Sequence, residues 1–381
     1  MIEVANRLHT VEEYYFSKKL REVNTLIASG KPIINLGIGS PDLAPPKKVL
    51  EAITNSLQDP SAHKYQSYQG LPELRDAMAA FYKEHFKVPL NPANEILPLM
   101  GSKEGIMHIS MAYLNEGDEV LIPNPGYPTY ESVTKLVGAK PVFYELDSAN
   151  NWSPDLKALS QRDLSKVKIM WVNYPHMPTG AMPSKFLFEE LVAFGKKHNI
   201  LIVNDNPYGF VLNETQQSLL SVPGAKDVCL ELNSLSKTFN MAGWRVGMVI
   251  GHSKHISNVL KVKSNMDSGM FYGIQKGAIE ALKCSKMWFS TLNSVYKQRR
   301  DLVWQLADAL HCTYDKEATG LFVWAKLPEH LKSEEFIDSV LYNNHIFITP
   351  GTIFGSKGEG YIRFSLCATT EVLEEAIARF K

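Results

Sequence analysis

One lysine stands in a stretch of small, hydroxyl-bearing and basic residues between two apolar runs. The stretch extends from Ser234 to Arg245 and contains Lys237, and the flanking runs Val228–Leu232 and Val246–Ile250 have the length and composition of buried strands. A lysine amine can form an imine with a carbonyl cofactor, and an arginine can clamp a phosphate through two parallel hydrogen bonds. Because α/β proteins bind ligands in loops at strand ends, the stretch is a candidate cofactor site. In isolation, such a short motif would more often be a solvated surface turn.

A carboxylate also follows an apolar run. Asp205 ends the run that begins at Leu201, and Tyr208 comes three residues later. A carboxylate at the tip of a buried strand loses hydration unless it meets a cation, and the protonated nitrogen of a pyridine ring is one such cation. A helix cap or a structural ion pair is the alternative interpretation.

Two further segments could bind anions. Gly101-Ser102-Lys103 closes one apolar run and opens a helical pattern; the N–H groups at a helix start bind phosphate, although a simple N-cap serine fits equally well. Arg363 lies inside the apolar run Tyr361–Ser365, where an arginine is costly without an anion. That anion could be a substrate carboxylate or a structural glutamate.

Two proline-containing loops follow other apolar runs, at Asn124–Pro128 and Asn173–Gly180. Proline restricts the backbone of both loops. Tyr127 in the first loop could stack on a flat ring or could pack in the core.

The elements that must position these residues alternate along the chain. Strands are predicted at Ile96–Met100, Glu119–Ile122, Pro141–Leu146, Lys168–Asn173, Ile200–Asn204, Val228–Leu232 and Val246–Ile250, and helices at Lys103–Leu114, Thr129–Val137 and Lys185–His198. Continuous apolar strands separated by helices favour a mostly parallel sheet covered by helices on both faces. The sequence therefore predicts an α/β fold with a seven-stranded sheet.

The two ends of the chain predict a smaller α+β unit. Residues 1–30 are interpreted as an arm followed by a helix, 32–41 as a short strand, and a helix begins near Lys47. A long helical segment is predicted at Gly273–Leu310, followed by elements at Gly320–Leu327, Ser333–Asn343, Ile346–Thr349, Gly360–Leu366 and Glu371–Phe380. We expect this C-terminal part to pack with the N-terminal segment. The domain boundaries that we predict are 1–45 for the arm and part of the small domain, 46–275 for the large domain, and 276–381 for a bridging helix and the rest of the small domain.

Composition excludes several classes of protein. The 40 basic and 40 acidic residues balance, which gives no electrostatic argument for nucleic acid or an acidic membrane surface. Four scattered cysteines lack metal or redox spacing. Cys284 and Cys312 could be neighbours, but we expect buried free thiols and no metal. Neither a signal segment nor a transmembrane run is recognisable, so a cytoplasmic protein is expected.

Taken together, these residues resemble the fold-type I aminotransferases that use pyridoxal 5′-phosphate, over essentially the whole chain. The resemblance rests on an ordered set: Tyr65 with Gly70 and Leu74-Arg75, Gly101-Ser102-Lys103, Pro125-Gly126-Tyr127, Pro178-Thr179-Gly180, Asp205 with Tyr208, Ser234 with Lys237, Arg245, and Tyr361 with Arg363. It implies a large domain with a mostly parallel seven-stranded sheet between helices, and a small α+β domain.

The resemblance also implies roles for individual residues. Lys237 would hold the cofactor through an imine and move a proton, Asp205 would keep the pyridine nitrogen protonated, and Tyr208 would hydrogen-bond the phenolic oxygen of the ring. Around the cofactor would lie Tyr127, stacked on the ring, together with Gly101, Ser102, Lys103, Asn173, Met177, Ser234, Ser236 and Arg245.

Two implied roles concern the substrate and the assembly. Arg363 would bind the α-carboxylate of the substrate, with Gly39 lining the pocket. Tyr65 would reach the phosphate in the neighbouring subunit, which implies a homodimer with shared active sites.

Met177 departs from the family pattern, which usually has asparagine immediately before Pro-Thr-Gly. A thioether cannot donate a hydrogen bond to the phenolic oxygen. We therefore expect the imine to keep its proton to higher pH than in typical relatives, and a weakened or repurposed enzyme is the alternative.

The substrate stays open at this point. Gly101–Gly105, Asn240–Trp244 and Ser264–Gly269 are most similar to the branch that contains alanine, LL-diaminopimelate and some aspartate aminotransferases. Ser264 stands near the place of an arginine that binds a distal carboxylate in some aspartate enzymes, and Lys103 could serve instead. An apolar pocket shaped by Met177, Met266, Met270, Phe271 and Tyr272 is the other possibility. Glutamate and 2-oxoglutarate are the expected second pair, and a β-lyase on the same cofactor is the rival activity.

Overall fold

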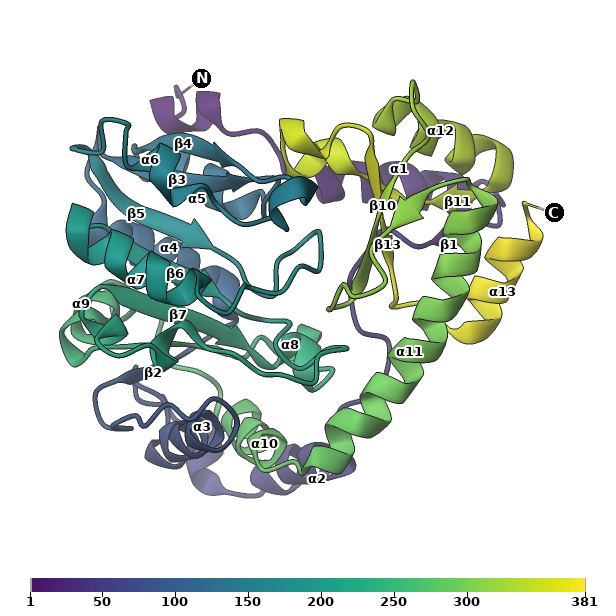
Figure 1. Cartoon of the computed structure of the whole chain (residues 1–381). Coiled ribbons are helices and arrows are strands. Elements are labelled where there is room, and N and C mark those ends of the chain that lie inside the picture. The colour runs from purple at the N-terminus through teal and green to yellow at the C-terminus, as the bar shows by residue number, and fades with distance from the viewer. Residues whose placement is uncertain (1, 381) are drawn as a thin grey trace.

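The computed structural model describes residues 2–380, which form two lobes (Figure 1). The larger lobe contains a seven-stranded sheet of β2 (Ile96–Leu99), β3 (Glu119–Asn124), β4 (Lys140–Glu145), β5 (Val167–Val172), β6 (Leu201–Asp205), β7 (Cys229–Ser234) and β8 (Gly247–Gly251). Its strand order is β2-β8-β7-β6-β5-β3-β4. The pairs from β7 to β4 are parallel, whereas β8 is antiparallel to both of its neighbours. The predicted mostly parallel sheet is confirmed.

Residues that alternate along each strand face different helices, because successive side chains point to opposite faces of a sheet. Val203 packs in a cluster with residues of α4 (Ser102–Tyr113), α5 (Thr129–Leu136) and α9 (Ser253–Lys263). The adjacent Ile202 packs in the main core with residues of α7 (Leu187–His198) and α3 (Pro72–His85). The sheet is therefore buried on both faces, which explains its continuous apolar strands.

The smaller lobe joins the two ends of the chain. Its four-stranded antiparallel sheet contains β12 (Thr349–Pro350), β13 (Tyr361–Ser365), β10 (Phe322–Lys326) and β9 (Thr313–Tyr314). β1 (Ile34–Asn35) pairs in parallel with β11 (Ile346–Phe347). The helices of this lobe are α1 (Tyr15–Ala28), α12 (Ser333–Asn344) and α13 (Thr370–Ala378). The β1–β11 pair confirms that the N-terminal segment packs with the C-terminal part.

Two predicted elements are wrong in extent. The segment Gly273–Leu310 forms two helices, α10 (Tyr272–Leu282) and α11 (Lys286–Ala309), because Ser285 takes an extended conformation as the N-cap of α11. The strand predicted at Ile346–Thr349 is divided between β11 and β12, which belong to different sheets. α11 runs from α2 (Lys47–Ser56) and α10 to the smaller lobe (Figure 1).

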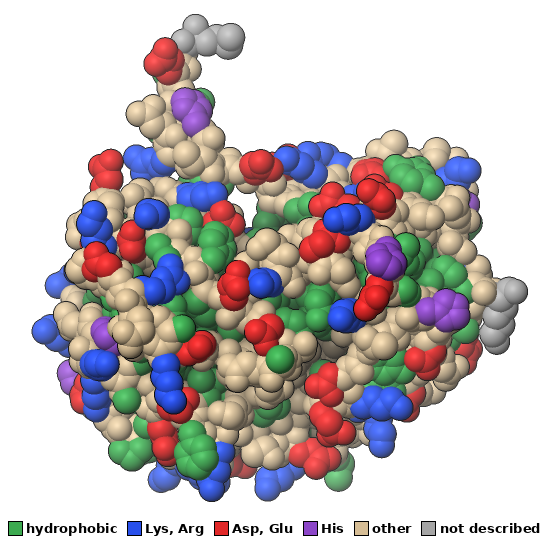
Figure 2. Space-filling view, turned by 45° about the horizontal axis from the view of Figure 1, so that its top comes forward, with side chains coloured by type: hydrophobic (Ala, Val, Ile, Leu, Met, Phe, Trp, Pro, Cys, Tyr) green, Lys and Arg blue, Asp and Glu red, His purple; other side chains and the backbone are tan. Residues whose placement is uncertain are grey.

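The first residues of the chain project from the larger lobe (Figure 2). The short turn η1 (Asn6–Thr10) contacts α5 and buries none of its residues. Acidic and basic side chains are interspersed over the face that Figure 2 shows, in keeping with their equal numbers. None of the helices within residues 2–380 combines the length and the hydropathy of a membrane span, and all four cysteines are free thiols.

Candidate active site

A cavity of about 540 Å³ collects most of the candidate residues. It lies where β5, β6 and β7 end, and residues of the smaller lobe close its other side. The sequence-predicted residues that line it are Gly39, Ser102, Lys103, Tyr127, Asn173, Met177, Asp205, Tyr208, Ser234, Ser236, Lys237, Arg245 and Arg363. Segments nearly 330 residues apart in the chain therefore meet at one site.

Lys237 enters this cavity from the short helix α8 (Leu235–Thr238), which follows β7 directly. Its Nζ donates a hydrogen bond to the carbonyl oxygen of Gly39, in the smaller lobe. Burial, with smaller contributions from the cationic Arg363 and Arg245, lowers the pKa of Lys237 to about 8. A lysine with such a pKa is partly neutral near pH 7 to 8, as a nucleophilic amine must be.

Asp205 faces the cavity from the end of β6. Its Oδ2 accepts a hydrogen bond of 3.0 Å from the hydroxyl of Tyr130, and its Oδ1 is buried without a partner. Burial raises the pKa of this carboxyl to about 7. A buried carboxyl oxygen that lacks a donor is costly, so a cationic N–H group entering the cavity would satisfy it.

Tyr130 is a site residue that sequence reasoning missed. It lies in α5, stacks on Trp171 with ring centroids 5.0 Å apart, and is fully buried. The helix predicted at Thr129–Val137 includes Tyr130, but nothing in the sequence distinguishes this residue from the others in that helix.

The phosphate-binding candidates form a cradle of backbone and guanidinium. Gly101 has φ +89°, and a Cβ at this position would collide with the guanidinium group of Arg245. Ser102 begins α4, which has twelve residues, and its side chain lies on the cavity wall. The Oγ atoms of Ser234 and Ser236 lie 2.9 Å apart on the same wall. Free N–H groups at a helix start, hydroxyls and an arginine together suit a phosphate.

The amide of Asn173, which lines the cavity, makes two hydrogen bonds to the backbone. Its Nδ2 donates to the backbone oxygen of Asp205, and its Oδ1 accepts a hydrogen bond of 2.8 Å from the backbone N–H of Met177. Both ends of this amide therefore hold neighbouring backbone segments in place.

Arg363 is buried and has donors to spare. One terminal nitrogen donates to the backbone oxygen of Gly37 at 2.9 Å, and the other lies 3.4 Å from the sulfur of Met177. Its Nε has no partner. Burial lowers the pKa of the guanidinium to about 10. No carboxylate pairs with Arg363 among residues 2–380, so the structural glutamate considered from the sequence is absent from this part of the chain.

Three aromatic rings surround the same guanidinium. The Cζ atom of Arg363 lies 3.8 Å from the ring centroid of Phe322, 4.7 Å from that of Phe354 and 5.5 Å from that of Phe16. All three line the cavity, as do Tyr14 and Leu20. None of these residues was a site candidate in the sequence, because aromatic and apolar residues in a helix, a strand or a turn resemble ordinary core.

Several other candidates do not line this cavity. Tyr65 is 92 % exposed on the outside of the larger lobe. Met266 and Phe271 are largely exposed, whereas Met270 is buried. Of the five residues proposed for an apolar pocket, Met177 is the one that reaches the cavity of its own chain, within the described residues.

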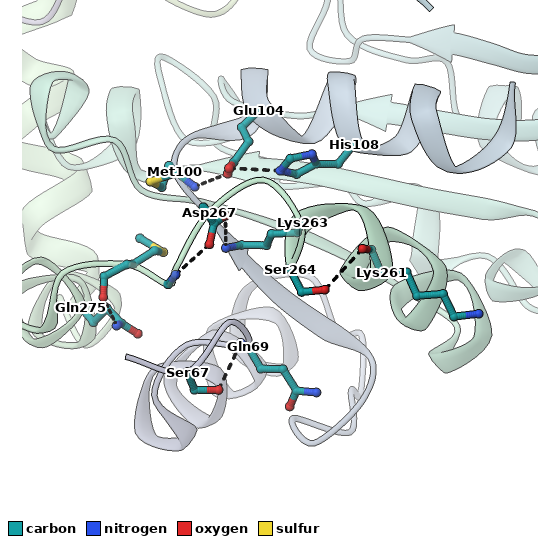
Figure 3. A network of polar contacts seen from close by, with 12 residues as sticks. Ser67, Gln69, Met100, Glu104, His108, Lys261, Lys263, Ser264, Asp267 and Gln275 are labelled. Atoms are coloured by element: carbon teal, nitrogen blue, oxygen red, sulfur yellow. Dashed lines mark hydrogen bonds and ion pairs between the residues drawn. The ribbon is translucent and has the colours of Figure 1, made fainter. Parts of the chain in front are cut away.

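A buried charge cluster lies next to the start of α4 (Figure 3). Glu104 Oε1 is 3.1 Å from His108 Nε2, and Lys263 Nζ is 2.6 Å from Asp267 Oδ2. The carboxyl of Glu104 also accepts the backbone N–H of Met100, and that of Asp267 accepts the N–H of Gly269. Ligand atoms of Glu104, His108 and Asp267 lie within 4.8 Å of one another, so the start of α4 and the loop that follows α9 lie side by side.

The site as a whole fits one cofactor. A reactive amine, a buried carboxyl that lacks a donor, aromatic walls and a phosphate cradle meet within one cavity. Pyridoxal 5′-phosphate carries the matching aldehyde, ring nitrogen, flat ring and phosphate.

Comparison with known proteins decides the family. The model of the family described as aminotransferase class I and II matches residues 31–380. The chain belongs to the class I and II aminotransferases. It is 42 % identical to the LL-diaminopimelate aminotransferase of Natranaerobius thermophilus, over 99 % of the chain and 98 % of that protein. It is 39 % identical to the LL-diaminopimelate aminotransferase of Aquifex aeolicus, over 100 % of the chain and 99 % of that protein.

A solved structure agrees with this assignment. The substrate-bound structure of BacF from Bacillus subtilis has a TM-score of 0.96 and 34 % identity, and the match covers 100 % of the chain and 97 % of BacF. The predicted fold type, amino transfer and pyridoxal 5′-phosphate dependence of this aminotransferase are therefore confirmed, and the rival β-lyase activity is not favoured.

Proposed function

We propose that this aminotransferase uses Lys237, Asp205 and Tyr208 as its catalytic residues and glutamate with 2-oxoglutarate as one of its two substrate pairs. The observation that supports this proposal best is the pairing of Lys237 with Asp205 in one cavity. The amine of Lys237 and the unpartnered oxygen of Asp205 both face that cavity, and their pKa values of about 8 and about 7 are shifted by burial.

Several residues would hold the cofactor. When bound, pyridoxal 5′-phosphate supplies an aldehyde and a ring that accepts electrons. Its phosphate would lie against the N–H groups of Ser102 and Lys103, with Gly101, Ser234, Ser236 and Arg245 around it. Tyr127 would cover one face of the ring, and Tyr208 would donate to its phenolic oxygen, while Asn173 holds Met177 and Asp205 in place.

Lys237 and Asp205 would share the proton chemistry. Asp205 would hold a proton at the ring nitrogen, because its unpartnered oxygen needs a donor and the site around it is buried. Lys237 would accept the proton that leaves Cα of the amino acid, since its lowered pKa leaves part of the amine neutral.

Arg363 would bind the α-carboxylate of the amino acid. Its partly unused guanidinium and its fixed position between rings suit bidentate recognition of a carboxylate. Gly39 would allow close approach on the same side, because a side chain there would collide with Phe322.

The shared site of a homodimer would involve two neighbouring segments of the larger lobe. Tyr65 and Tyr68 are 92 % and 44 % exposed, and Met266 and Phe271 are 58 % and 43 % exposed. The segments touch, since a Cβ on Gly269 would lie 2.5 Å from the backbone oxygen of Gln66. Exposed aromatic and apolar side chains mark protein interfaces, and Tyr65 would reach the phosphate in the partner.

We also propose the domain boundaries 1–45, 46–275 and 276–381.

The test combines spectroscopy with product analysis. Purified protein supplied with pyridoxal 5′-phosphate should retain the coloured cofactor after gel filtration and convert 2-oxoglutarate to glutamate with a suitable donor. Lys237→Ala should abolish turnover, whereas the exposed Lys283→Ala should not. Protein that binds no cofactor would refute the proposed roles, and release of ammonia without consumption of 2-oxoglutarate would refute amino transfer.

A further inference from the structure

One part of the cavity wall, which we call the front, is built from aromatic and apolar side chains. Tyr14, Phe16 and Leu20 come from the start of α1, Ile38 from the segment after β1, and Phe322 and Phe354 from the smaller lobe. Phe16, Phe322 and Phe354 surround the guanidinium of Arg363. A substrate whose α-carboxylate binds Arg363 would therefore have rings next to its side chain.

The segment that carries Tyr14 and Phe16 passes from one lobe to the other. η1 lies against α5 of the larger lobe, whereas α1 lies in the smaller lobe near α12 (Figure 1). Lys19, which is buried, anchors α1 to α12 through Asp338, with 2.8 Å between Nζ and Oδ1. Val23 of α1 packs with Leu341 and Phe347. These contacts fix α1, and with it Tyr14 and Phe16, in place at the front of the cavity.

The cavity lacks an acidic side chain that could pair with a second amino group on the substrate, within the described residues that line it. Among the described residues that line it, Asp205 is the one carboxylate, and it lies on the cofactor side. The segments that we propose to reach the partner's site, 64–70 and 264–271, contain one acidic residue, Asp267, which is paired with Lys263 at 2.6 Å. An ammonium group at the far end of a substrate would be desolvated there without a carboxylate to pair with.

One cation does face the front of the cavity. The Nζ atom of Lys103 lies 4.5 Å from the ring centroid of Tyr14, a cation–π distance. This ammonium could bind the distal carboxylate of glutamate while the neighbouring rings accept a flat apolar side chain. Both partners of an amino transfer could then use the same Arg363.

We propose that the second substrate pair is an amino acid with an aromatic side chain and its 2-oxo acid, recognised by Phe16 and Tyr14. This inference rests on the proposed function and deepens it. Aromatic rings pack favourably edge-to-face or offset on other rings. The front of the cavity holds the cation Lys103 but no acid for the distal ammonium of LL-diaminopimelate, the substrate that the names of the relatives indicate.

The first test measures half-reactions of the loaded enzyme in the absence of 2-oxo acid. Glutamate, phenylalanine, tyrosine, alanine and LL-diaminopimelate are each mixed with the enzyme, and the spectral change of the bound cofactor gives a second-order rate constant. Phenylalanine or tyrosine should react at least about tenfold faster than alanine and LL-diaminopimelate. Phe16→Ala should reduce the rate with phenylalanine at least about tenfold more than it reduces the rate with glutamate.

The second test measures binding without chemistry. 3-Phenylpropionate and pimelate lack the amino group, and calorimetry on the loaded enzyme gives their dissociation constants. We expect 3-phenylpropionate to bind more tightly than pimelate, and Phe16→Ala to remove the difference. Phe16→Leu keeps an apolar side chain and should give an intermediate value. Lys18→Ala, which changes an exposed position on the same helix, is the matched control.

The outcomes separate the two proposals. If LL-diaminopimelate reacts faster than phenylalanine and tyrosine, or if the Phe16→Ala variant binds 3-phenylpropionate as tightly as the natural protein does, the aromatic assignment is wrong while amino transfer stands. If glutamate also leaves the spectrum unchanged, the proposed function itself fails.

Discussion

Met177→Asn should lower the pKa of the Lys237 nitrogen in the loaded enzyme. Met177 lies on the cavity wall, and its sulfur contacts Arg363 at 3.4 Å without being able to donate. An asparagine at this position brings an N–H donor toward the phenolic oxygen. That oxygen bears an uncompensated negative charge only after the lysine nitrogen loses its proton, so the donor stabilises the deprotonated form more.

The size of the effect follows from the strength of such a hydrogen bond. A bond to a charged group contributes about 1.5–3 kcal/mol. Each 1.36 kcal/mol corresponds to a factor of ten in a proton-dissociation constant, so the constant should increase roughly tenfold to a hundredfold. Absorbance of the loaded enzyme as a function of pH measures this constant directly.

Met177→Leu is the matched control for this titration. It removes the sulfur contact with Arg363 but adds no donor, so its titration should follow that of the natural protein. If Met177→Asn and Met177→Leu titrate alike, the reasoning about the missing donor is refuted.

Four further perturbations test other parts of the site. Asp205→Asn should reduce the single-turnover rate with glutamate at least about a hundredfold, about 2.7 kcal/mol, because an amide does not hold a proton on the ring nitrogen; a rate within tenfold would contradict this role. Mixing Tyr65→Ala with Lys237→Ala subunits should restore about a quarter of the natural activity. About half of the dimers would contain one subunit of each kind, and one of the two sites in such a dimer would have both Lys237 and the partner's Tyr65. No recovery would mean that Tyr65 acts within its own chain. His176→Asn should reduce the loss of stability in acid, because burial lowers the pKa of His176 from 6.5 to about 3. Between those pH values the unfolded chain binds a proton at His176 that the folded chain does not bind, so the free energy of unfolding falls by about 1.4 kcal/mol per pH unit as the pH decreases. Denaturant unfolding at several pH values measures this slope. Lys263→Met leaves Asp267 unpaired in a buried site and should cost about 3–5 kcal/mol of unfolding free energy, whereas the exposed Lys283→Met should leave unfolding unchanged.

Residues that follow apolar strands could be placed from the sequence because the carboxyl ends of parallel strands share one edge of a sheet. Lys237 and Asp205 follow β7 and β6, which are neighbours in the sheet. Their meeting is a consequence of strand order. The chain pattern predicted a mostly parallel sheet and the family resemblance predicted the site, but neither gave the order of the strands. Arg363 required the resemblance, since its strand lies in another lobe.

Other features depended on contacts that no local pattern encodes. Tyr130 reaches Asp205 because α5 packs over the sheet, and Tyr14 and Phe16 reach the cavity because Lys19 and Val23 fix α1 on the smaller lobe. The break between α10 and α11 depends on the extended backbone of Ser285, in a stretch whose composition is compatible with a continuous helix. Long-range packing of this kind is decided by tertiary structure.

The charges around the cavity explain why the site should select amino acids. One carboxyl, that of Asp205, lines the cavity together with four cationic side chains, those of Lys103, Lys237, Arg245 and Arg363. Burial raises the pKa of Asp205 to about 7 and lowers the pKa values of Lys237 and Arg363. The cavity therefore carries an excess of positive charge in a desolvated space. A phosphate would offset the charge at Arg245, and one anion would still be missing at Arg363. An amine without a carboxylate leaves that arginine unpaired, which costs the binding energy of a charge-assisted bond. We therefore expect the site to require a carboxylate of every substrate, and we expect Lys103 and the rings around Arg363 to distinguish one amino acid from another.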